Sequence, residues 1–160
     1  MTRKIGAYSA ILTATPAIST NIYADGDLIG SAEISLPLAV RADGLAESSG
    51  IIQAVIITDL AAQGADIDVY FFDRELANTT FTDNAAWDIS DVDLLTLIGV
   101  AAIIDWRTLN DNSNGQLLNL GLPFVIPANA TALFAVIVSR GTPTYVTSLD
   151  LTLRVAILQD

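Results

Sequence analysis

The stretch that decides the fold is "VTSLDLTLRVAIL", residues 146–158. Apolar and polar residues alternate along it, and a period of two residues is typical of a β-strand with one buried face. The pattern places the following residues on the buried face: Leu149, Leu151, Leu153, Val155 and Ile157. Asp150, Thr152 and Arg154 fall on the opposite face, which we expect to meet water.

Two upstream segments are predicted to be strands of different kinds. Between Gly30 and Val40 the even positions are apolar, which predicts a half-buried strand, and Pro37 indicates an edge strand or a bulge. The segment "IIQAVIITDL", residues 51–60, is β-branched and apolar on both faces, as expected for a central strand of a packed sheet. Further strands are predicted at 66–73, 100–106, 117–125 and 131–139.

Turn residues predict how these strands connect. Asp25-Gly26, between two apolar pairs, favours a type I′ turn and hence a β-hairpin. The short segment "AAQGA", residues 61–65, predicts a second hairpin that joins strand 51–60 to strand 66–73. Ser90, with Asp93 three positions later, matches a helix-capping pattern, so we expect one short helix over residues 91–98.

Together these elements predict an all-β protein, a β-sandwich or jelly roll of about eight antiparallel strands with one short helix. The length of 160 residues fits one domain. We therefore expect residues 1–20 to form an N-terminal arm or first strand, and residues 21–160 to form a single β-sandwich domain.

Composition limits the chemistry that the chain can perform. It has no histidine and no cysteine, which removes Ser-His-Asp and Cys-His catalysis and the usual zinc sites, so we expect no enzyme. The net charge of −11 opposes binding to nucleic acid, and no apolar run is long enough to span a membrane. An apolar content of 52% predicts that some surface is buried against another chain.

The segment "DNAAWDISDVDLL", residues 83–95, gathers four aspartates. Asp91 and Asp93 fall in the first turn of the expected helix, where the helix dipole favours negative charge. Asp83 and Asp88 fall in the loop before it. This arrangement favours a capped helix with an acidic rim, and the alternative is a calcium site made by the four carboxylates. No other cofactor is expected.

The two tryptophans, Trp87 and Trp106, are candidates for an aromatic interface or for core anchors. The alternative is a sugar-stacking platform, which they would share with Tyr23, Tyr70 and Tyr145.

Four segments, "IYADGDLIG", "DIDVYFFD", "SDVDLLTLIG" and "RGTPTYVTSLDLTLRVAILQD", resemble small all-β structural proteins of tailed bacteriophages that decorate or cement the capsid. The resemblance covers most of the chain from about Ile22 onward. It implies a virion protein that stands as a homotrimer on the outer surface of an icosahedral head and binds the major capsid protein. A phage tail or fibre component and a carbohydrate-binding β-sandwich module are the alternatives.

On this interpretation the N-terminal arm is the candidate contact with the capsid. Arg3, Lys4, Ile5 and Tyr8 would meet an acidic or apolar patch on the shell, although an ordinary first strand with a solvated tip explains the same residues.

Overall fold

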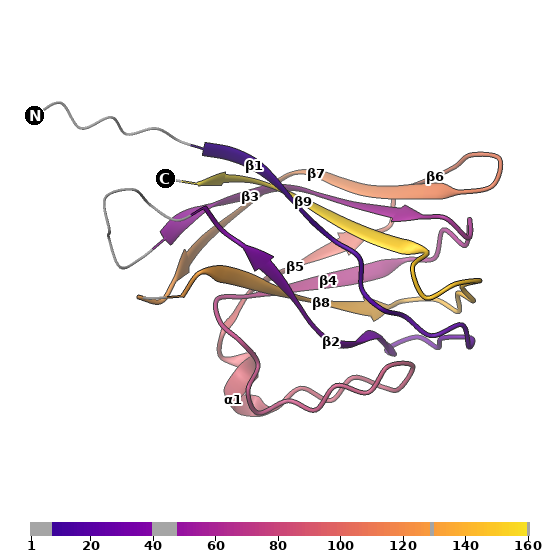
Figure 1. The fold of residues 1–160 in the computed structure, drawn as a ribbon, viewed down its shortest axis with the longest axis horizontal. Coiled ribbons are helices and arrows are strands. Elements are labelled where there is room, and N and C mark those ends of the chain that lie inside the picture. Colours follow the sequence, from indigo (N-terminus) through magenta and orange to yellow (C-terminus); the bar gives the residue numbers. More distant parts are fainter. Residues whose placement is uncertain (1–7, 40–47, 129, 160) are drawn as a thin grey trace, which may run out of the picture.

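The computed structural model describes residues 8–39, 48–128 and 130–159, and within these residues it shows two stacked antiparallel sheets (Figure 1). The strands are β1 (Tyr8–Ala14), β2 (Leu28–Pro37), β3 (Ser48–Asp59), β4 (Ile67–Phe72), β5 (Leu97–Ile103), β6 (Trp106–Thr108), β7 (Ser113–Ile126), β8 (Ala132–Ser139) and β9 (Leu151–Gln159). One short helix, α1 (Asp91–Leu94), lies in the loop between β4 and β5.

The strand order has the topology of a jelly roll. One sheet has the order β1-β9-β3-β7-β6 and the other has the order β2-β8-β4-β5. Apart from the three-residue β6, each sheet contains four strands, and most connections cross from one sheet to the other. The prediction of an all-β sandwich or jelly roll with about eight antiparallel strands and one short helix is confirmed.

The core lies between the two sheets and is built from alternating residues of the strands. On β9 the predicted residues Leu151, Leu153 and Val155 are fully buried, and Ile57 of β3 and Ile67 of β4 meet them in one apolar cluster. Because side chains on a strand point alternately to opposite faces, only about half of the apolar residues of β3 point into this cluster, and the others point to the outer face of the sheet.

The hairpin predicted at Asp25-Gly26 is wrong, although the turn itself is present. Gly26 has a φ of +91° and Asp25 does not have a positive φ, so the turn is of type II and not of type I′. The amide of Asp27 donates to the carbonyl of Ala24 to close the turn. The residues before the turn form no strand, because Ile18 and Tyr23 pack into the core from an irregular segment.

The second predicted hairpin is also wrong. Strands β3 and β4 belong to different sheets, and the segment 60–66 crosses from one sheet to the other. Asp59 organises this crossing, since its buried carboxylate accepts hydrogen bonds from the amides of Ala61, Gln63 and Gly64 at 2.7–2.9 Å. A short connection between two apolar segments can therefore form a hairpin or cross between two sheets, and tertiary packing decides which one forms.

Some boundaries differ from the predicted ones. The helix ends at Leu94 and not at Ile98, because β5 already begins at Leu97. Strand β9 begins at Leu151, so Leu149 is exposed in the preceding turn and not buried as predicted. Asp150, predicted to face water, is buried and accepts hydrogen bonds from the amides of Val146 and Thr147. None of the helical residues described forms a segment long and apolar enough to cross a membrane.

Candidate interaction surface

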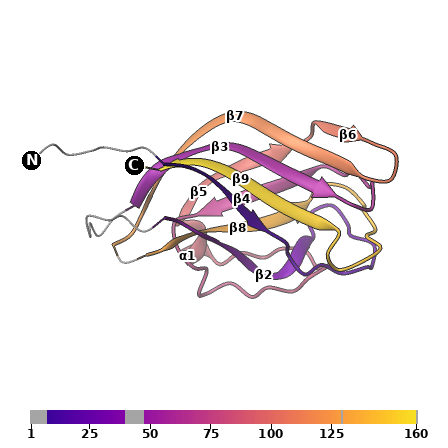
Figure 2. The ribbon, with the colours of Figure 1, turned by 45° about the horizontal axis from the view of Figure 1, so that its top comes forward.

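The outer face of the five-stranded sheet is the largest feature that the core does not explain. Strand pairing places these residues on it: Ser9, Ile11 and Thr13 on β1; Thr152, Arg154, Ala156 and Leu158 on β9; Ile51, Ala54, Ile56 and Thr58 on β3; Asn114, Gln116, Leu118 and Pro123 on β7; and Arg107 on β6. We call this surface the open face. Figure 2, in which the top of the molecule comes forward, shows β7, β3 and β9 lying next to one another.

Apolar side chains on the open face are exposed. Ile11 on β1 is 58% exposed and Leu118 on β7 is 51% exposed, and Ile51 and Leu158 on the two strands between β1 and β7 are exposed as well. The registers Ile11↔Ala156, Ala54↔Ala156 and Ala54↔Leu118 form one row across four strands. The registers Ser9↔Leu158, Ile51↔Leu158 and Ile51↔Pro123 form the neighbouring row, so the apolar side chains make one continuous surface. Such a continuous apolar surface is uncommon on a soluble monomer and marks an interaction site.

The open face carries few carboxylates, although the chain contains 18 acidic residues; Asp105, at the β6 edge, is ion-paired with Arg107. Its charged side chains are Arg107 and Arg154, both exposed. Among the described residues, the carboxylates lie on loops, on the four-stranded sheet or, as with Asp59, inside the core. Because Asp105 neutralises Arg107, the face is close to neutral on a protein with a net charge of −11.

The sequence of β3 is apolar on both faces, but the sequence alone does not show that one of these faces is uncovered. The pattern "IIQAVIITDL" suggested a strand covered on both sides, and the structure covers one side only. Finding this face needs the pairing of β1 with β9 and of β9 with β3, which are distant in the chain. The apolar content of 52% indicated an exposed apolar surface somewhere on the protein, but it did not give its position.

Two of the four aspartates of segment 83–95 have structural partners. Asp93 is only 3% exposed, and its carboxylate accepts hydrogen bonds from the amide of Asn78 at 2.9 Å, from Asn78 Nδ2 at 3.0 Å and from Thr79 Oγ1 at 2.7 Å. Burial would raise the pKa of Asp93, but these hydrogen bonds outweigh it and hold the pKa below its usual value. The predicted cap is confirmed, because Ser90 Oγ accepts from the amide of Asp93.

Asp83 lies apart from the helix cap and joins two other segments. Its Oδ1 accepts hydrogen bonds from Tyr23 Oη and from the amide of Gly30, both at 2.7 Å. Burial and this hydrogen bond raise the pKa of Tyr23 well above its usual value. Asp88 and Asp91 are exposed, and the described residues contain no group of three acidic side chains placed to hold a metal ion. The structure therefore does not gather the four carboxylates that would be needed for the calcium alternative.

Trp87 covers part of the four-stranded sheet. Its ring makes edge contacts with Tyr70 at 4.9 Å and with Phe72 at 6.3 Å between centroids. Trp106 packs beside Gly115, where an added Cβ would lie within 2.8 Å of the indole. Both indole N–H groups are buried, and neither has a hydrogen-bond partner among the described residues.

The other members of the predicted sugar platform are dispersed or covered. Tyr23 and Tyr145 are buried and meet each other edge to face at 5.9 Å. The half-buried Tyr70 packs edge to face against Trp87, and its hydroxyl accepts a hydrogen bond from Arg140. The structure therefore uses these aromatic side chains as packing and does not align them on one surface.

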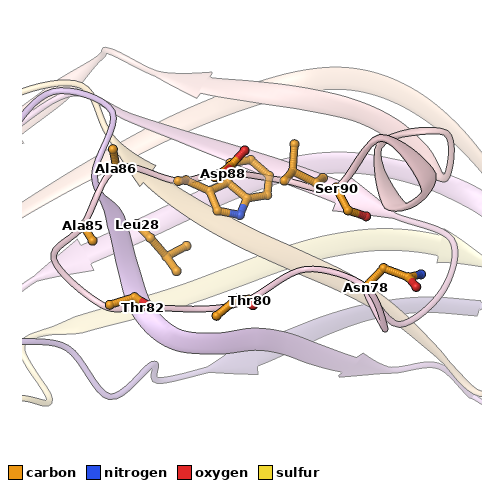
Figure 3. Close-up of a pocket in the computed structure, with 10 residues that line it drawn as sticks. Leu28, Asn78, Thr80, Thr82, Ala85, Ala86, Asp88 and Ser90 are labelled. Carbon is orange, nitrogen blue, oxygen red and sulfur yellow. The ribbon is translucent and has the colours of Figure 1, made fainter.

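A pocket of about 370 Å³ lies between the loop that carries Trp87 and strand β2. Figure 3 shows Leu28, Ala85 and Ala86 toward one end of it and Asn78 and Ser90 toward the other. Asn78 and Ser90 already hydrogen-bond to Asp93, so the polar end of the pocket belongs to the helix cap. We find no constellation of catalytic type among its lining residues.

The candidate capsid contact falls mostly outside the described residues. Arg3, Lys4 and Ile5 lie there, and Tyr8 is the first residue of β1, although its side chain is not among those described. Tyr8 pairs with Gln159, so the arm joins the sandwich beside the end of β9 (Figure 1).

Comparison with protein-family models and with curated proteins finds no match to this chain.

Proposed function

We propose that the chain is a structural virion protein that decorates and stabilises an icosahedral phage capsid as an oligomer. The observation that carries the proposal is the open face: an exposed, continuous apolar surface with few charges on a strongly acidic protein. A surface of this kind supports a protein that works inside an assembly. The jelly roll is compatible with this role, but the same fold serves many others.

The proposed mechanism is thermodynamic linkage. A protein that binds the assembled shell and not its separated subunits stabilises the shell, and many weakly bound copies sum to a large effect. In this scheme the N-terminal arm, with Arg3, Lys4, Ile5 and Tyr8, contacts the major capsid protein, while the rigid sandwich is the decorating body.

The first test is the location of the protein in virions of the phage that carries the gene. Antibodies against the chain are expected to label the head in electron microscopy. Labelling of the tail alone would replace the capsid role by the tail or fibre role, and unlabelled particles would overturn the proposal.

The second test is co-sedimentation with heads that lack the protein. The Arg3→Glu/Lys4→Glu double variant is expected to lose binding if the arm makes the contact. Lys4→Glu alone is compared with the matched control Arg74→Glu, which makes the same change in net charge at an exposed side chain outside the open face. Equal binding by both variants would remove the arm from the mechanism.

A further inference from the structure

We infer that the open face is covered by the open face of a second copy of this chain, related to the first by a two-fold axis. This inference rests on the proposed function, because it takes the chain to work as an oligomer, and it names the partner of the open face. It commits to two copies through this contact, whereas the resemblance implies three.

The distribution of charge favours contact between two copies through their open faces over contact through other surfaces. Two molecules that each carry a net charge of −11 repel each other, and the repulsion is strongest where carboxylates would be brought together. Two open faces bring few charges together, since Asp105 at the β6 edge is already ion-paired with Arg107. The arginines Arg107 and Arg154 lie toward one end of the face, with Thr13, Thr58 and Asn114, and the apolar rows lie toward the other end. A two-fold axis through the apolar end keeps the arginines of the two copies apart.

The area of the face is in the range that a stable contact needs. Strands are about 4.8 Å apart and rise about 3.3 Å per residue, so four strands about nine residues long cover roughly 20 Å by 30 Å, or about 600 Å². A specific protein interface buries about 800 Å² per partner, and the side chains and the rim of the sheet add to the flat area.

The position of the other apolar protrusion favours a two-fold contact. Helix α1 points Asp93 inward to its hydrogen bonds, and Val92, Leu94 and Leu95 are left exposed. The loop that carries α1 lies on the far side of the four-stranded sheet from β1, β9, β3 and β7 (Figure 1). A contact between the open face of one copy and α1 of the next would join opposite sides of the molecule and repeat without closing. Pairing of two open faces closes after two copies.

The experiment measures the mass of the full chain by light scattering and sedimentation over a dilution series. The wild type is expected to be a dimer that dissociates on dilution. Leu118→Asp places a carboxylate in the contact twice and is expected to raise the dissociation constant about 100-fold or more, since an unpaired charge would be buried. Ile11→Asp, at the edge of the same face, provides a second variant should Leu118→Asp not fold, and circular dichroism checks both.

The matched control is Leu95→Asp, which makes the same change at a side chain that is 87% exposed and lies off the face. It is expected to dimerise like the wild type. Raising the salt concentration is expected to tighten the wild-type dimer, because salt screens the repulsion between two acidic molecules.

A wild type that is monomeric at every concentration, a trimer, or a dimer that survives Leu118→Asp and Ile11→Asp would each overturn the inference. The virion-labelling test decides the proposed function independently, so a monomer that still labels phage heads would remove the dimer alone.

Discussion

The two outer faces of the sandwich are treated differently by the chain. The outer face of the four-stranded sheet is covered by the chain's own loop 73–96: Phe72 is fully buried there, with Leu76 and Trp87 packed over it. The outer face of the five-stranded sheet has no such cover among the described residues, and Leu118 is half exposed. Each face is apolar. The difference shows that the fold closes one face by itself and leaves the other uncovered by the described residues.

The largest expected effect compares these faces directly. Phe72→Ala should lower the free energy of unfolding by about 3–5 kcal/mol, because it removes a fully buried ring and leaves a cavity. Leu118→Ala should change the stability of the monomer by no more than about 0.5 kcal/mol, as is usual for an exposed site. Urea unfolding at a protein concentration below dimerisation measures both. Similar losses for the two variants would contradict the distinction between a covered and an open face.

A second expected effect concerns how the covering loop is held. Asp93→Asn replaces a carboxylate that accepts three hydrogen bonds, and at least one donor then faces another donor, which should cost about 2 kcal/mol at pH 7. Asp91→Asn, on the exposed side of the same helix, is the control and should cost much less.

The same carboxylate predicts an acid dependence. The pKa of Asp93 is lowered in the folded state, so its charged form contributes stability that is fully present above the unfolded pKa of about 3.9. This contribution is lost as the pH falls through the lower, folded-state pKa. The wild type should therefore lose more stability than Asp93→Asn between pH 5 and pH 2, measured as the shift in the urea midpoint. Parallel losses would show that Asp93 does not contribute.

The smallest expected effect is at Trp87. Trp87→Phe keeps an aromatic ring against Tyr70 and Phe72 and removes a buried indole N–H that has no hydrogen-bond partner in the described part of the chain. The lost volume and the removed unsatisfied group offset each other, so the stability should change by about 1 kcal/mol or less. In the wild-type protein, the fluorescence emission of the tryptophans should not change when glycans are added. A clear shift with a glycan would support the carbohydrate-binding alternative.

Much of the fold was predictable because it depends on local patterns. The alternation in β9 and the double-sided apolar pattern of β3 identify strands, and Ser90 with Asp93 identifies the helix start. The errors came from connections. Nothing local to residues 61–65 tells whether β3 and β4 pair or lie in different sheets, because the choice depends on contacts with β7, β8 and β9.

The candidate site was less predictable than the fold for the same reason. Segment 83–95 is a cluster of carboxylates in the sequence. In the structure Asp83 and Asp93 lie apart, and each accepts hydrogen bonds from different partners. The open face is assembled mainly from β1, β3, β7 and β9, and no single segment reveals that its outward positions carry few charges. Surface chemistry spread over four strands becomes visible only in the folded protein.

The central claim, that a partner copy covers the open face, is tested most directly by thiol labelling, because the chain contains no cysteine of its own. Leu118→Cys places a single thiol on the open face, and Leu95→Cys places one directly after α1; both side chains are exposed in one copy. At concentrations that favour the dimer, a maleimide reagent should label Leu118→Cys several-fold more slowly than Leu95→Cys, and the difference should disappear on dilution. Equal labelling of the two variants at every concentration would contradict the account.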